Sequence, residues 1–77
     1  MDIRGKVQSL SSIIDGAIID SFIQEQSESI YSILIRGKNI TITNPETFVK
    51  YIRLAKNMKV SMREDETVEV IISYDNS

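Results

Sequence analysis

Two stretches of the chain alternate between apolar and polar residues, which is the pattern of β-strands. The clearer one covers residues 30–36 and 39–43, with Gly37-Lys38 between them as a two-residue turn. This pattern predicts a β-hairpin over residues 30–43. The second alternation predicts a C-terminal strand over residues 67–73.

Between these two stretches, apolar residues recur with the helical period of 3.6 residues, which predicts a helix over residues 45–59. Asn44 suits the N-cap and Pro45 suits the first helical position. The negative charge of Glu46 in the first turn is stabilised by the positive end of the helix dipole. The apolar residues on one side of this helix are Phe48, Tyr51, Ile52, Leu54, Ala55 and Met58. We expect the helix to fold back over the hairpin, so that Phe48, Tyr51, Ile52, Ala55 and Met58 pack against Ile33, Ile35, Ile40 and Ile42.

The N-terminal region has apolar residues at spacings of three and four, which predicts a short helix over residues 3–14. Gly16 breaks the chain, either as a helix stop or within a tight turn. Residues 17–24 favour a strand, although their pattern also continues the first helix, and residues 25–29 read as a loop. After the predicted long helix, Val60 and Met62 alternate before a charged run over residues 63–66, which we interpret as a hairpin loop or a bulge.

These elements predict a single α+β domain over residues 1–77, in the order helix, two or three antiparallel strands, helix, strand. In outline this order resembles the double-stranded-RNA-binding domain, which runs helix, three strands, helix. Here the second helix starts with Asn-Pro-Glu-Thr and lacks the lysine cluster of that family, so the resemblance is topological. In size and composition the chain is also similar to many short open reading frames of bacterial viruses and plasmids, whose products are often inhibitors.

The composition predicts an oligomer, because a chain of 77 residues buries only a thin core. With no cysteine and no histidine, neither disulfides nor a metal are expected to supplement that core, which leaves a partner subunit, most simply in a homodimer. Because the chain has no cysteine and its N-terminus lacks the continuous apolar run of a signal peptide, we expect a cytoplasmic protein. No apolar run approaches the roughly 20 residues that span a bilayer, so we expect no transmembrane role.

The charges are unevenly distributed in this chain of net charge −2. Residues 36–63 contain seven basic side chains and only one acidic one, whereas the flanking segments are acidic. The candidate binding residues are Arg36, Lys38, Lys50, Arg53 and Lys56. Cations grouped in this way can bind phosphate groups, although a simpler interpretation is that they solubilise the outer face of a helix.

Catalytic chemistry has little support in this sequence. Without histidine or cysteine, the nucleophiles and bases reduce to Ser, Lys, Tyr and carboxylates, and the serines precede no glycine elbow. The three glycines are too scattered for a phosphate-binding loop, and residues 64–66 lack the ligand spacing of a calcium site. We therefore expect no enzyme, no cofactor and no metal.

The function that this sequence favours is a small intracellular binding protein of regulatory or inhibitory type. It would act as a homo-oligomer on a macromolecular or anionic small-molecule partner, such as a nucleotide, through the basic helix face. The alternative is a nucleic-acid-binding module that uses the helix over residues 45–59 and the Gly37 turn. Net acidity and the lack of exposed aromatic residues in the basic stretch weigh against this alternative.

Overall fold

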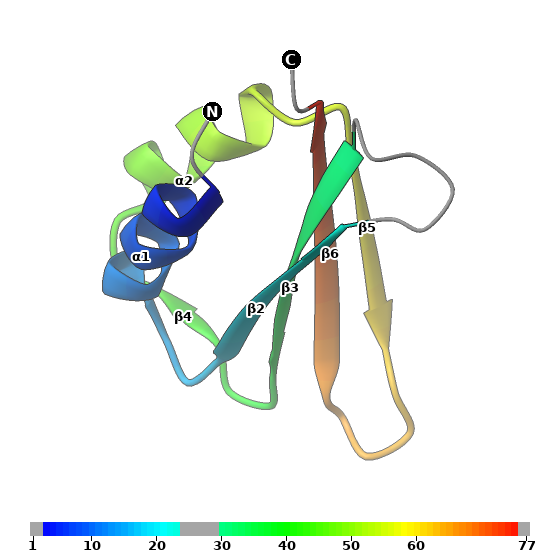
Figure 1. Cartoon of the computed structure of the whole chain (residues 1–77). Helices are drawn as coiled ribbons and strands as arrows, with labels where there is room; N and C mark the ends of the chain where they lie inside the picture. The colour runs from blue at the N-terminus through cyan, green and yellow to red at the C-terminus, as the bar shows by residue number, and fades with distance from the viewer. Residues whose placement is uncertain (1–2, 24–29, 76–77) are drawn as a thin grey trace.

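The computed structural model describes residues 3–23 and 30–75 and has a mixed α+β fold with antiparallel sheets. In chain order its elements are α1 (Ile3–Ile13), β1 (Ile14–Asp15), β2 (Ile18–Ile23), β3 (Ile30–Gly37), β4 (Thr41–Ile42), α2 (Pro45–Arg53), β5 (Asn57–Met62) and β6 (Val68–Asp75). Figure 1 shows both helices on the same face of the larger sheet, while β5 lies at the far edge, away from the helices.

The larger sheet has four strands in the order β2-β3-β6-β5, all antiparallel to their neighbours. The central strands β3 and β6 pair along eight residues, from Ile30 opposite Asp75 to Gly37 opposite Val68. The short strands β1 and β4 form a separate pair, and the Thr43 N–H donates to the Ile13 carbonyl at 2.7 Å. This second pair connects the end of α1 to the start of α2.

The core lies between α1 and the two central strands. Every second residue of β3 and β6 faces the helices, and α1 together with β1 supplies the opposing side chains. The buried apolar residues are Leu10, Ile13, Ile14, Tyr31, Ile33, Ile35, Ile72 and Tyr74. On the other face of the sheet, Ser32 and Ser73 are also buried and share a hydrogen bond of 2.9 Å between their hydroxyls.

Several sequence predictions are confirmed. The N-terminal helix, the break at Gly16 and the strand after it appear as α1, a turn and β2, and the C-terminal strand appears as β6. The charged run is the loop of the β5–β6 hairpin, closed by a hydrogen bond of 2.9 Å from the Arg63 N–H to the Thr67 carbonyl. The predicted loop over residues 25–29 lies outside the described residues.

The predicted hairpin over residues 30–43 is wrong. The strand β3 extends to Gly37 and pairs with β2 and β6, whereas only Thr41 and Ile42 of the second half are in a strand, and they pair with β1. The alternating pattern identified the strand correctly but not its partner. An eight-residue match with β6 satisfies more backbone groups than a five-residue match with residues 39–43 would.

The predicted helix over residues 45–59 ends too late. The helix α2 stops at Arg53, and by Lys56 the backbone N–H already donates to the Ser73 carbonyl of β6 at 2.7 Å. Residues 57–62 form the strand β5. Met58 fits a helical period from Tyr51 and also an alternation with Val60, so pairing with β6 decided between the two.

Because α2 is shorter than predicted, some of the residues predicted for the core are less buried than expected. Ile33 and Ile35 are buried, and Phe48, Tyr51, Ala55 and Ile40 pack against the core while remaining partly exposed. Ile52 is only half-buried, and Leu54, Met58 and Ile42 are exposed. The helix α2 contains no fully buried residue, because it covers the edge of the core rather than its centre.

Candidate functional site

The end of α2 presents two basic residues to solvent. The Asn44 side chain begins the helix by accepting a hydrogen bond from the Thr47 N–H at 3.1 Å, and Pro45 occupies the first turn. At the other end of the helix, Lys50 and Arg53 occupy the last turn, and both are exposed. Their charges also complement the negative end of the helix dipole, so part of their role is structural.

A shallow hollow lies on the outer side of α2. Its volume is about 360 Å³, and its lining residues are Pro45, Glu46, Val49, Lys50 and Arg53. This lining combines an apolar surface with two cations and one carboxylate. Among the described residues, neither Lys50 nor Arg53 forms an ion pair, so both are available to a negatively charged group.

Lys56 lies just beyond α2, at the same end of the molecule. Its ammonium group is 3.6 Å from the Asp75 carboxylate, with both side chains about half exposed. This exposed ion pair contributes little to stability and can exchange partners. Lys56 can therefore contribute to a basic surface with Lys50 and Arg53, but Asp75 offsets its charge.

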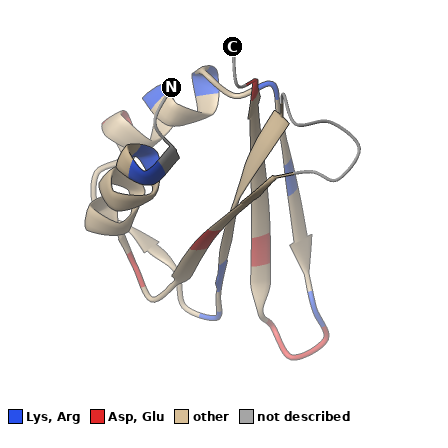
Figure 2. Cartoon of the chain, viewed as in Figure 1, with Lys and Arg blue, Asp and Glu red and all other residues tan. Residues whose placement is uncertain are grey.

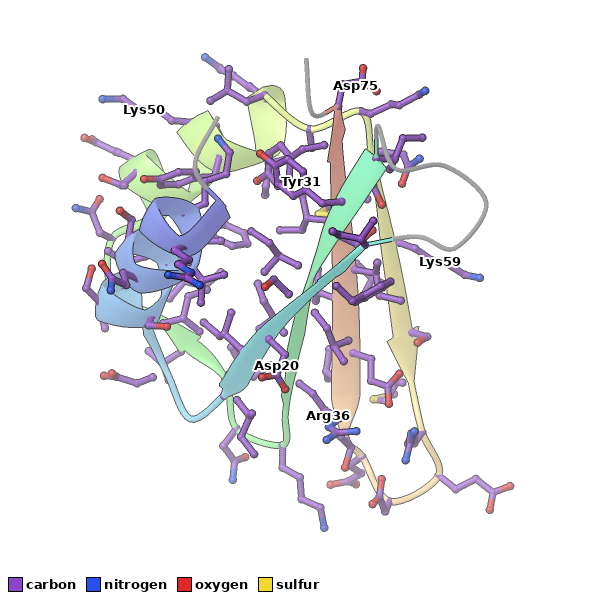
Figure 3. The ribbon with its side chains drawn as sticks, viewed as in Figure 1. Asp20, Tyr31, Arg36, Lys50, Lys59 and Asp75 are labelled. Atoms are coloured by element: carbon purple, nitrogen blue, oxygen red, sulfur yellow. The ribbon has the colours of Figure 1, made fainter. Side chains whose placement is uncertain are left out.

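Arg36 and Lys38 are not part of this surface. Figure 3 shows Arg36 and Lys50 at opposite ends of the molecule. Arg36 lies opposite Glu69 in the β3–β6 register, and Lys38 follows in the turn after β3. Figure 2 shows the same separation between the basic segments of α2 and those at the lower end of the sheet. The structure therefore brings three of the five predicted site residues to one end and leaves two at the other.

A buried lysine between aromatic rings is a feature that the sequence analysis missed. Lys6 is only 7% exposed, and its ammonium group lies 4.8 Å from the ring centre of Tyr74 and 5.7 Å from that of Tyr51. The ring of Tyr31 stacks on Tyr74 at 5.7 Å. The signal was present, since Lys6 lies one helical turn before Leu10 on the apolar side of α1.

This cluster joins α1, α2 and β6 at one point. The Tyr74 hydroxyl donates a hydrogen bond of 2.9 Å to the Tyr51 carbonyl, which is in the last turn of α2 and has no partner within that helix. Burial raises the pKa of Tyr74 to about 12, with smaller contributions from Tyr31 and Tyr51. Because the rings enclose the lysine, the cluster supports the fold rather than presenting a reactive group.

No described helix is long and apolar enough to cross a membrane. The described part of the chain also holds no group of three or more acidic residues placed to bind a metal ion. Comparison with protein-family models, with curated proteins and with solved structures finds no match for this chain. The candidate site therefore has to be judged on its own geometry.

Proposed function

We propose that this chain is a small, non-catalytic binding protein of the cytoplasm that acts as a homodimer. It takes up an anionic group of its partner at the end of α2 and thereby regulates or inhibits that partner. The observation that supports this proposal is the hollow lined by Val49, Lys50 and Arg53, where two cations without ion-pair partners among the described residues border an apolar surface.

The chemistry of these residues suits a phosphate group. Arginine offers a planar set of donors that matches phosphate oxygens, and lysine adds a point charge. Lys50 and Arg53 are three residues apart in a helix, so their side chains leave α2 on the same side. Nucleotides combine phosphates with a flat apolar base, and Val49 supplies an apolar surface beside the cations.

A titration with ATP, followed by NMR of the labelled protein, tests this proposal. We expect the largest chemical-shift changes in residues 45–56. The double variant Lys50→Gln with Arg53→Gln should weaken binding at least tenfold, which corresponds to about 1.4 kcal/mol.

The matched control is Arg36→Gln with Lys38→Gln. It removes the same charge from the opposite end of the molecule. If both double variants weaken binding equally, the attraction depends on total charge and not on a site on α2. Absence of binding to ATP, to polyphosphate and to duplex DNA at low salt would contradict the proposal altogether.

The nucleic-acid alternative is tested with the same variants. A module using both α2 and the Gly37 turn would have to contact nucleic acid at both ends of this molecule. Binding to duplex DNA through several phosphates falls steeply with added salt, and in that case both double variants should lower the affinity and the salt dependence.

A further inference from the structure

The strand β5 is an edge strand with an exposed apolar row. It pairs with β6 on one side, and no described strand pairs with its other side. Met58, Val60 and Met62 face the same side of the sheet as the core, since they lie opposite Ile72, Val70 and Val68. They are nevertheless 43%, 60% and 71% exposed, because the helices do not reach over β5 (Figure 1).

The backbone of β5 shows which groups point to the free edge. The Arg63 N–H donates to the Thr67 carbonyl, so these two residues form a hydrogen-bonded pair at the end of the β5–β6 ladder. In an antiparallel ladder such pairs alternate with non-hydrogen-bonded ones. Lys59 and Ser61 therefore direct their backbone groups to β6, whereas the three apolar residues Met58, Val60 and Met62 direct theirs outward.

This edge is complementary to itself. When two β5 strands pair antiparallel around a two-fold axis at Val60, Val60 faces Val60 of the partner subunit. Met58 then faces Met62 of the partner subunit, so the outward backbone groups of all three residues find partners. The same register joins the two apolar rows into one continuous surface, in which cross-strand neighbours cover part of the side chains that the isolated chain leaves exposed.

The charges agree with this register. Lys59 is the only charged residue within β5. It would face Ser61 of the partner subunit, on the face of the sheet opposite to the apolar row. No like charges meet along the paired edges.

The other edge of the sheet is less suitable. The strand β2 carries Asp20 near its centre, and α1 already packs against this strand. Pairing of two copies about the centre of β2 would bring two Asp20 carboxylates close together, whereas the register centred on Val60 places Lys59 opposite a serine.

We propose that the edge strand β5 pairs antiparallel with β5 of a second copy, in the register centred on Val60, and forms an eight-stranded sheet. This inference rests on the proposed homodimer and is independent of anion binding by α2. The interaction surface consists of Met58, Val60 and Met62.

Disulfide trapping tests the register directly, because the natural chain has no cysteine. Paired residues of this type have Cα atoms about 5.5 Å apart, which is within the range of a disulfide. Val60→Cys should therefore form a covalent dimer under mild oxidation. Ser61→Cys is the matched control, since two such residues would lie about 8 Å apart, beyond that range. Equal rates of cross-linking, or no cross-linking of Val60→Cys, would overturn the register.

Sedimentation tests the interface without a cross-link. Val60→Lys should raise the dissociation constant of the dimer at least tenfold, because it places two charges face to face at the axis. The control Ile18→Lys introduces the same charge on the opposite edge strand, where Ile18 is 63% exposed, and should leave the dimer intact. Circular dichroism checks that both variants are folded.

The results separate the two proposals. We expect the dissociation constant of a specific dimer to lie below about 100 micromolar. A natural chain that stays monomeric at this concentration would therefore overturn the β5 interface. A dimer lost in Ile18→Lys but kept in Val60→Lys would move the interface to β2 and overturn it as well. In either case the ATP titration of the Lys50→Gln with Arg53→Gln variant still decides the function of α2.

Discussion

The tyrosine–lysine cluster shows how single residues complete the fold. The last carbonyls of a helix lack the hydrogen-bond partners that continuing the helix would supply, and here three of them find partners nearby. The Lys50 and Ile52 carbonyls accept from the N–H groups of Leu54 and Ala55, and the Tyr51 carbonyl accepts from the Tyr74 hydroxyl. One side chain of β6 therefore satisfies a carbonyl at the end of α2 and also provides an aromatic face for the buried Lys6.

Replacing Tyr74 by phenylalanine should lower the free energy of unfolding by about 1 kcal/mol, because it leaves the Tyr51 carbonyl without its donor. It should also change the response to alkali. The pKa of Tyr74 is raised from 10 to about 12 in the folded state, so the folded protein holds the proton more tightly than the unfolded chain. Stability from this group is complete below pH 10 and is lost as the pH rises through about 12.

Urea unfolding at about pH 8, 10, 11 and 12 measures this effect, because these steps span the pKa of Tyr74 in the unfolded chain and in the folded protein. The stability of the natural chain should fall over the alkaline steps, and that of Tyr74→Phe should fall less. An equally steep loss in the variant would assign the alkaline sensitivity to other groups.

At the level of elements, the turn after β1 and the turn after β3 contact each other through their backbones. Gly16, after β1, has a φ of +79°, and a Cβ there would clash with the Asn39 carbonyl oxygen. A Cβ on Gly37, at the end of β3, would clash with the Gly16 carbonyl oxygen. This contact holds the start of β2 against the turn that leads to β4, and so positions α2 relative to the sheet.

Gly37→Ala should destabilise the fold by about 1–3 kcal/mol, because the added methyl group meets backbone atoms that cannot move independently. Gly16→Ala should cost more, since it adds the strain of a positive φ to a similar clash. Thermal and urea denaturation measure both changes. The exposed Asn39→Ala, in the same turn, serves as control and should stay within about 0.5 kcal/mol of the natural chain. A Gly37→Ala variant as stable as this control would contradict the close contact.

For the whole molecule, the uneven cover of the sheet is the main feature. The core is deepest under α1, where Leu10 and Ile33 are fully buried, and it thins under α2. No described helix lies over β5, so one side of a 77-residue chain remains apolar and exposed. This arrangement is the physical basis for the proposed dimer.

The depth of the core predicts how stability depends on position. Ile33→Ala should cost about 2–5 kcal/mol, because it empties a closed site at the centre of the sheet. Ile52→Ala removes the same atoms from a half-buried position on α2 and should cost less than half as much. Urea denaturation of both variants gives the comparison. Equal losses would mean that α2 packs as deeply as α1.

Local patterns in the sequence determined the kinds of element. The spacing of Val7, Leu10 and Ile13 was sufficient for α1, and the Asn44–Pro45 step was sufficient for the start of α2. These signals depend on neighbours within a few residues, which the sequence displays directly. For the same reason the charges of Lys50 and Arg53 on the outer side of α2 were predictable.

Only the tertiary structure decided which elements pair and where α2 ends. The alternation of β3 is the same whether it pairs with residues 39–43 or with β6, and Met58 fits both a helix and a strand. Hydrogen bonding to β6 settled both questions, because backbone groups that become buried need partners. The partner strand lies more than 30 positions away from β3 in the sequence, so no local pattern encodes that choice. The separation of Arg36 from Lys50 follows from the same pairing.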